Sequence, residues 1–355
     1  MLKLYTSFAK YALESSNTTE DLPLPLATPI GEKILMSIPL ITIIGVQKGG
    51  TTNLRRNLLT HPLVTGMPNE VHFFDQGPDT YPKLGQWPGD GRERELSPGA
   101  VGRILSDYAK RCLEQVQPKP VRYEKVAAMS RGVIVESSPR YILSPLAPYR
   151  MKMVRPRAKL VLVLRDPTER HAQICRILRM VMCKMEADPG YSSLEEQINT
   201  HFHAPGQAEA YIEGGEAAYQ PYGALCRGEN ATSADLWACY ADMATHNPLH
   251  RGLYADQLER WFRILVVDSA EMFVNFTGTV TSVAEWAGLP KHDFEYDRHQ
   301  FEGSCSGDRR RRHLPDFFAE DGRYETMLEE EELFRDWYRP HNERLEKLLG
   351  REMMW

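Results

Sequence analysis

Residues 41–54 read Ile41-Thr42-Ile43-Ile44-Gly45-Val46-Gln47-Lys48-Gly49-Gly50-Thr51-Thr52-Asn53-Leu54, and this stretch decides the fold. The run from Leu40 to Val46 is almost unbroken in apolar, mostly β-branched side chains. Such a run predicts a strand that is covered on both faces of a parallel sheet. The paired glycines predict a tight turn, and Thr51 or Thr52 is expected to cap the helix that follows.

This strand–turn–helix also predicts an anion site. Gly49 and Gly50 lack side chains, so backbone N–H groups can close on an anion. The helix start adds free N–H groups and the positive end of its dipole, and Lys48 adds a mobile charge. A triphosphate P-loop carries its lysine after the last glycine, whereas Lys48 precedes the pair. The order therefore argues against a triphosphate; an ordinary strand–turn–helix of an α/β protein is the alternative.

Further apolar runs alternate with helical patterns along the chain. Strands are predicted within 132–141, 159–167 and 264–268, and helices within 101–116, 168–182, 252–262, 281–288 and from 333 onwards. This alternation predicts a parallel sheet with helices on both sides. Ligands of such sheets bind at the carboxyl ends of the strands, where we expect the loop after Ile44 and the turns at Glu136 and Arg165.

The composition is that of a soluble globular enzyme, with 42% hydrophobic and 26% charged residues. A net charge of −5 argues against general binding of nucleic acid. No segment has the length and apolar character of a membrane span. We expect residues 1–35 to be a lead-in without a signal peptide, and 36–355 to be a single domain with a variable insertion at 188–248.

The cysteines and sequons bear on compartment and metal binding. The six cysteines form no C-x-x-C pair, so we expect no metal site. Cys226 and Cys239 are candidates for a disulfide, with free core cysteines as the equal alternative. Sequons at Asn17, Asn230 and Asn275 permit a glycoprotein in a secretory location.

The longer pattern resembles a known family. The order G-x-x-K-x-G-T-T in 45–52 is similar to the 5′-phosphosulfate loop of sulfotransferases that use 3′-phosphoadenosine-5′-phosphosulfate (PAPS). Its continuation through His61-Pro62 to Asn69-Glu70-Val71-His72-Phe73-Phe74-Asp75 resembles the Golgi carbohydrate branch, of heparan and chondroitin type. The resemblance covers roughly 41–350. It implies a three-layer, P-loop-NTPase-like fold with a central parallel β-sheet flanked by helices.

The resemblance also implies a reaction: in-line transfer of the sulfuryl group of PAPS to a hydroxyl of a glycosaminoglycan-like carbohydrate, without a metal. Glu70 matches the general base, with a structural ion pair as the alternative. His72 would share the face of Glu70 in an extended chain, to orient the acceptor, to act as the base instead, or to pack as an ordinary histidine. Lys48 matches the group at the leaving phosphate. The residues implied to bind the 5′-phosphate are Gly49, Gly50, Thr51 and Thr52.

The rest of the nucleotide is assigned by two later motifs. Residues 165–170 resemble the R-D-P-x-E-R block, whose first arginine, here Arg165, binds the 3′-phosphate. Asp166 and Arg170 are expected to hold the turn. Gln173 stands where the family usually has a serine, and its amide can donate in its place. The loop 307–313 resembles a late nucleotide-closing loop, with a surface basic patch as the alternative; its cofactor residues are Arg310, Arg311 and Arg312.

The acceptor side departs from the heparan-type pattern. Ser137 stands where heparan-type relatives usually have lysine, which moves the resemblance toward chondroitin or dermatan types, or toward an acceptor other than heparan. Ser138, Arg140 and Tyr141 are expected to line the acceptor side.

Other functions stay open beside this one. A small-molecule hydroxyl or amine is the alternative acceptor. A P-loop kinase or nucleotidase is disfavoured by the position of Lys48, and a non-catalytic sulfonucleotide- or glycan-binding protein is disfavoured by the presence of Glu70. The resemblance and the sequons imply the Golgi lumen, whereas the lack of a recognisable signal peptide or anchor leaves the cytoplasm open.

Overall fold

The computed structural model describes residues 38–67, 70–75, 104, 106–109, 111–112, 132–171, 208–214, 249–261, 263–295 and 323–355. They belong to two compact units, which are described in turn. The first comprises Met1–Val163, Arg263–Val267 and Glu271–Tyr296, and the second Leu164–Phe262, Asp268–Ala270 and Asp297–Trp355. The predicted single domain over 36–355 stays a prediction. The predicted lead-in and most of the predicted insertion lie outside the described residues.

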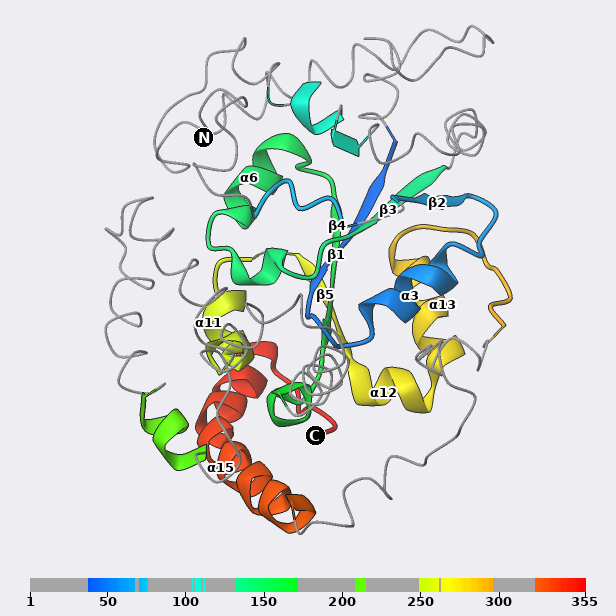
Figure 1. Ribbon diagram of the computed structural model, residues 1–355. Helices are drawn as coiled ribbons and strands as arrows, with labels where there is room; N and C mark the ends of the chain where they lie inside the picture. Colours follow the sequence, from blue (N-terminus) through cyan, green and yellow to red (C-terminus); the bar gives the residue numbers. More distant parts are fainter. Residues whose placement is uncertain are drawn as a thin grey trace, which may run out of the picture. The chain divides into compact units, whose positions relative to one another are not determined.

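The first unit is built on a five-stranded sheet of order β2-β3-β1-β4-β5 (Figure 1). The central strand β1 (Leu40–Gly45) pairs in parallel with β3 (Val133–Ser137) on one side and β4 (Lys159–Leu164) on the other. β2 (Val64–Gly66) pairs in parallel with β3, and β5 (Ile264–Asp268) lies beside β4. The predicted strands are confirmed, whereas β2 was not predicted.

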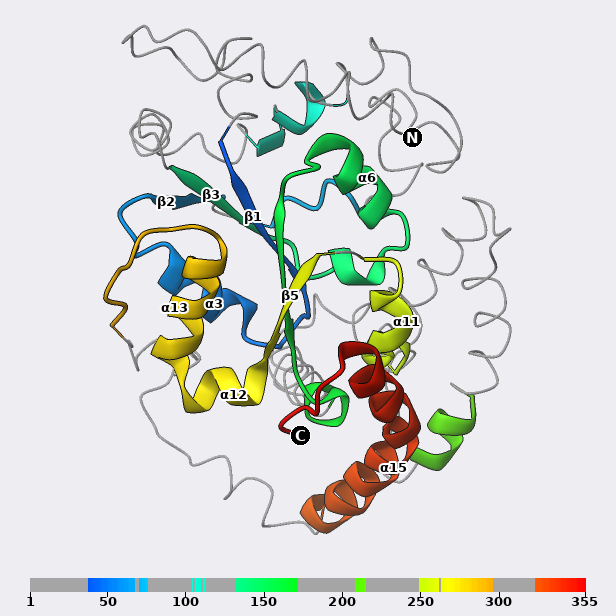
Figure 2. The same ribbon diagram turned by 180° about the vertical axis from the view of Figure 1, so that it is seen from behind.

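Helices cover both faces of this sheet. α3 (Thr51–Leu58) and α13 (Phe276–Trp286) pack together on one side, and α6 (Ala147–Val154) lies on the other (Figures 1 and 2). Every residue of β1 is buried, because a strand covered on both faces has no solvent side. The predicted three-layer α/β fold is confirmed.

Two helix starts differ from the sequence prediction. The prediction that a threonine caps α3 is wrong. Gly50 takes the N-cap position at φ 102°, and no side chain caps the helix. The helix expected over 281–288 begins earlier, as α13, after the short helix α12 (Ser269–Val274). Asn275 caps α13 by accepting a hydrogen bond from the Gly278 N–H at 3.2 Å.

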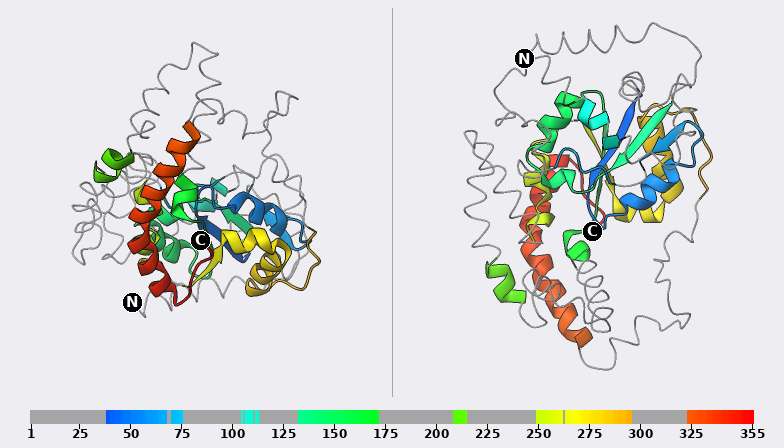
Figure 3. Two further views of the ribbon diagram at one scale, coloured as in Figure 1. Left: turned by 90° about the horizontal axis from the view of Figure 1, so that it is seen from below. Right: turned by 45° about the horizontal axis from the view of Figure 1, so that its top comes forward.

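The second unit contains the long helix α15 (Arg323–Leu349), drawn orange to red in Figure 3, which packs against α11 (Tyr254–Leu258). The 3₁₀ turn η3 (His250–Gly252) precedes α11, so the helix predicted over 252–262 is shorter than expected. Arg344 of α15 forms ion pairs with Asp256 and Glu259. The core cluster consists of Ala208, Leu249, Leu253, Phe334 and Tyr338. Among the described helices, none has the length and apolar character needed to cross a membrane.

Candidate active site

The loop after β1 has a tight backbone that favours glycine at positions 49 and 50. Lys48 and Gly50 have φ values of 68° and 102°, in the left-handed region. A Cβ on Gly49 would lie 2.8 Å from the Val163 carbonyl oxygen, and one on Gly50 would lie 2.6 Å from Cε of Met272. Gly49 is therefore required by the close approach of backbone to backbone, and Gly50 is favoured by its left-handed φ.

The start of α3 completes an anion cradle. The Asn53 and Leu54 N–H groups are bonded to the Gly50 carbonyl at 3.0 and 3.1 Å, whereas the N–H groups before them have no intrahelical acceptor. Lys48 is exposed beside this helix end, as is Thr52, while Thr51 is buried. Free N–H groups, a positive helix end and a lysine fit a phosphate or phosphosulfate group.

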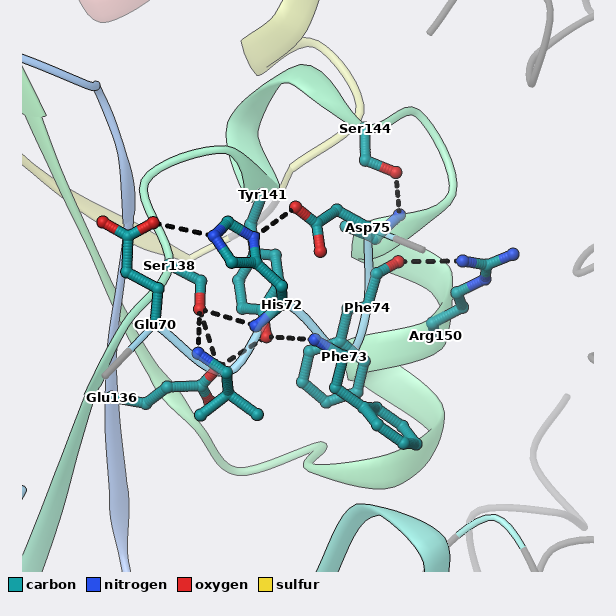
Figure 4. Close-up of polar contacts among 12 residues, drawn as sticks. Glu70, His72, Phe73, Phe74, Asp75, Glu136, Ser138, Tyr141, Ser144 and Arg150 are labelled. Atoms are coloured by element: carbon teal, nitrogen blue, oxygen red, sulfur yellow. Dashed lines mark hydrogen bonds and ion pairs between the residues drawn. The ribbon is translucent and has the colours of Figure 1, made fainter. Parts of the chain in front are cut away.

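A row of three ionisable side chains lies in the same unit (Figure 4). His72 Nε2 is 2.7 Å from Oε2 of Glu70, and His72 Nδ1 is 2.8 Å from Oδ2 of Asp75. The exposed fractions of the side chains are 46% for Glu70, 24% for His72 and 2% for Asp75. The row thus runs from a buried carboxylate to one that a substrate can reach.

The charge state of His72 follows from this geometry. Carboxylate oxygens accept hydrogen bonds, so both ring nitrogens donate and the ring is an imidazolium. Burial by itself would lower the pKa of His72, but its hydrogen bonds to Asp75 and Glu70 and their negative charges outweigh burial and raise the pKa to about 9. At neutral pH His72 therefore has no lone pair to accept a proton, and its Nε2–H donates to Glu70.

The chain that carries this row is not a strand. His72 has a φ of 49°, so its contact with Glu70 does not come from the extended chain considered at the sequence level. Arg150 donates to the Phe74 carbonyl at 2.9 Å. Ser138 Oγ accepts from the N–H groups of Val71 and His72 at 3.0 and 3.2 Å. Side chains that follow β3 in the sequence thus make the hydrogen bonds that a neighbouring strand would otherwise make.

Ser138 and Tyr141 were predicted to line the acceptor side. The structure buries both, at 0% exposure, and uses their hydroxyls beneath the base segment, which we define as residues 70–75. Tyr141 Oη accepts from the Phe73 N–H at 3.0 Å. Arg140 between them is partly buried. Contact of these three residues with an acceptor stays a prediction.

The 3′-phosphate residues are only partly described. Arg165, in the second unit, donates from Nε to Oε2 of Glu169 at 3.2 Å. Asp166 closes the turn after it by accepting from the Thr168 N–H at 2.8 Å, and Arg170 is 1% exposed. Gln173, Arg310, Arg311 and Arg312 lie outside the described residues. Binding of the 3′-phosphate by these groups stays a prediction.

Sequence reasoning missed Asp75 as a site residue. The spacing E-x-H-x-x-D was visible in the sequence, and a carboxylate that fixes a histidine is a common device. Within the described ranges, no three His, Cys, Asp or Glu side chains are grouped so as to hold a metal ion.

The sequence was then compared with known families. The profile of the sulfotransferase domain family matches residues 39–302, which is most of the chain. The chain belongs to the sulfotransferase domain family. The predicted family, PAPS-dependent sulfotransferases, is thereby confirmed, and PAPS is the co-substrate that it implies. The glycine loop, Lys48 and the base segment of this sulfotransferase all lie within the matched range.

Individual relatives are distant. Heparan sulfate glucosamine 3-O-sulfotransferase 3B1 of Mus musculus is 24% identical over 96% of this chain and 71% of its own length. Heparan sulfate glucosamine 3-O-sulfotransferase 5 of Homo sapiens is 28% identical over 39% of this chain and 30% of its own length. The crystal structure of a sulfotransferase from Alicyclobacillus acidocaldarius aligns with 89% of this chain and 97% of its own, at 22% identity and a TM-score of 0.45.

Proposed function

We propose that this sulfotransferase moves the sulfuryl group of PAPS to a hydroxyl of a glycosaminoglycan-like carbohydrate, with Glu70 as the general base. One observation carries the proposal: the exposed Glu70 carboxylate is held by an imidazolium that is itself fixed by buried Asp75. A protein that only binds sulfonucleotides has no use for such a base. The matched family supports the sulfuryl donor.

The donor end of the site falls to the loop after β1. PAPS, when bound, supplies a sulfuryl group attached to a phosphate leaving group. The N–H groups at the start of α3 bind the 5′-phosphate, and the Lys48 ammonium places positive charge where negative charge develops on the bridging oxygen. Gly49 and Gly50 have no side chain that could stand between the backbone N–H groups and the anion.

The acceptor end falls to Glu70 and His72. Glu70 takes the proton of the attacking hydroxyl, while the Nε2–H of His72 keeps its hydrogen bond to Oε2 and holds the carboxylate in place. Asp75 holds the opposite ring nitrogen. The pKa of His72 is about 9, so its ring already carries both protons at neutral pH. Glu70 is therefore the one of the two that can take a proton from the acceptor.

The proposed acceptor is inferred from the family branch. The relatives are named for the glucosamine of heparan sulfate, which supports a carbohydrate over the alternative of a small-molecule hydroxyl or amine. Because Ser137 stands in place of the usual lysine, chondroitin and dermatan are tested beside heparan. The resemblance to the Golgi carbohydrate branch supports a location in the Golgi lumen.

For the nucleotide, Arg165 is the proposed ligand of the 3′-phosphate.

Two measurements test this function. Titration calorimetry with PAPS and with its desulfated product is expected to show binding, and binding of ATP–Mg²⁺ without binding of PAPS would refute the donor. Incubation with labelled PAPS and a panel of heparan, chondroitin, dermatan and small hydroxyl or amine acceptors is expected to label a polysaccharide. Label that appears only on the small acceptors would overturn the carbohydrate assignment.

A further inference from the structure

Beneath the base segment, a carboxylate is enclosed by three hydroxyl groups. Glu136 on β3 has an exposed fraction of 0%. Its Oε1 lies 2.5 Å from the Tyr141 hydroxyl and 3.3 Å from that of Ser138, and its Oε2 lies 3.0 Å from the Tyr108 hydroxyl (Figure 4 shows Glu136, Ser138 and Tyr141). A carboxylate without solvent contact needs such partners.

The direction of these hydrogen bonds is fixed. Ser138 and Tyr141 accept from backbone N–H groups of residues 71–73, and an N–H group can only donate. Each hydroxyl therefore has its own proton left to donate, and Glu136 Oε1 receives both. The bonds run from three consecutive N–H groups, through two hydroxyls, to one carboxylate oxygen.

We propose that Ser138 and Tyr141 are positioning residues for the catalytic base: their hydroxyls, oriented by Glu136, fix the backbone that presents Glu70 and His72. This inference rests on the proposed function, in which Glu70 is the base. Glu136, Ser138 and Tyr141 are all buried, so we expect them to act on the reaction through the base segment and not by touching the reactants. A displacement of about 1 Å at reacting groups can cost about 100-fold in rate, which gives this support a catalytic consequence.

The network fits the ionised form of Glu136. An ionised carboxylate accepts all three hydroxyl protons, whereas a protonated one would force one hydroxyl to turn away. Burial raises the pKa of Glu136, against the hydrogen bonds of Tyr141, Tyr108 and Ser138 and the positive charge of Arg155. Tyr108, Tyr141 and Cys112 are also buried beside Glu136, and burial raises the pKa of each.

The chain offers a matched control for this proposal. Tyr108 and Tyr141 each donate one buried hydrogen bond to Glu136, and each ring packs against Phe74, with centroids 5.2 and 5.4 Å away. Only Tyr141 also accepts from the base segment, through the Phe73 N–H. Tyr141→Phe and Tyr108→Phe thus each remove one hydroxyl donor from Glu136. Only Tyr141→Phe also removes the acceptor of the Phe73 N–H.

The test is an NMR titration of the His72 imidazole in both variants, assigned with a His72→Gln spectrum. For Tyr141→Phe we expect the pKa of His72 to fall from about 9 toward 6.5, and kcat to fall roughly 10- to 100-fold with little change in the KM for PAPS. Tyr108→Phe is expected to match the wild type in both. Ser138→Ala, which removes the acceptor of two N–H groups, is the second variant if Tyr141→Phe does not fold.

Equal behaviour of the two tyrosine variants, or an unchanged His72 titration in Tyr141→Phe, would overturn the positioning role. The titration needs no turnover. A protein that transfers no sulfuryl group but shows the expected difference in His72 would therefore refute the proposed function and support the positioning role.

Discussion

Because His72 is positively charged in the folded protein, we expect part of the free energy of unfolding to depend on pH. Its pKa is about 9, against about 6.5 for an ordinary histidine. At about 1.4 kcal/mol per pKa unit, this gap corresponds to about 3 kcal/mol. Glu70 is 46% exposed, so solvent screens its share, and we expect about 2 kcal/mol to be measured. Because the pKa is raised by folding, the stabilisation is fully present below pH 6.5 and is lost as the pH rises through 9.

The assay is urea unfolding of the wild type and of His72→Gln at several pH values from 6 to 10. Glutamine keeps a polar side chain but cannot carry the charge. The difference in unfolding free energy between the two proteins cancels the contribution of titrating groups that do not contact His72. We expect this difference to shrink by about 2 kcal/mol between pH 6.5 and 9.5. A difference that stays constant over this range would refute the imidazolium and, with it, the argument that makes Glu70 the base.

Two further predictions follow from the loop and the core. Gly49→Ala would place its Cβ 2.8 Å from the Val163 carbonyl oxygen, a backbone atom, so calorimetry is expected to show PAPS binding weakened at least about 10-fold; the control Gly288→Ala, at φ 82° with open space around it, is expected to cost about 1 kcal/mol and leave binding intact. Equal loss of binding in both would contradict the clash. Burial lowers the pKa of His61, whose Nδ1 accepts from the Leu63 N–H. The neutral ring is therefore stabilising above pH 6.5, and the wild type should lose unfolding free energy relative to His61→Gln as the pH falls below 6.5; parallel urea curves for the two proteins would contradict this.

The strands were predictable because their burial is written in the sequence. β1 and β4 are covered on both faces and read as continuous apolar runs, and β5 keeps the predicted bounds Ile264–Asp268. β2 has three residues, too few for any periodicity. The cap of α3 was missed because the positive φ of Gly50, a consequence of the tight loop, places glycine rather than threonine at the N-cap.

The site was predictable in its residue types but not in its connections. Glu70 and His72 were found from a motif, and their contact depends on the left-handed backbone of His72, which no local pattern encodes. The partners of the base segment come from Ser138 and Tyr141, more than sixty residues away in the sequence. Such tertiary hydrogen bonds replace a strand neighbour, and for this reason residues predicted to face the acceptor support the base from below.

The most direct test of the account is the rate of sulfuryl transfer by Glu70→Gln, measured beside its affinity for PAPS. Glutamine can still accept the hydrogen bond from His72 Nε2, but it cannot take a proton from the acceptor. We expect the transfer rate to fall by roughly 10²- to 10⁴-fold, with the Kd for PAPS within about twofold of the wild type. A Glu70→Gln enzyme that transfers sulfuryl groups at the wild-type rate would contradict the account.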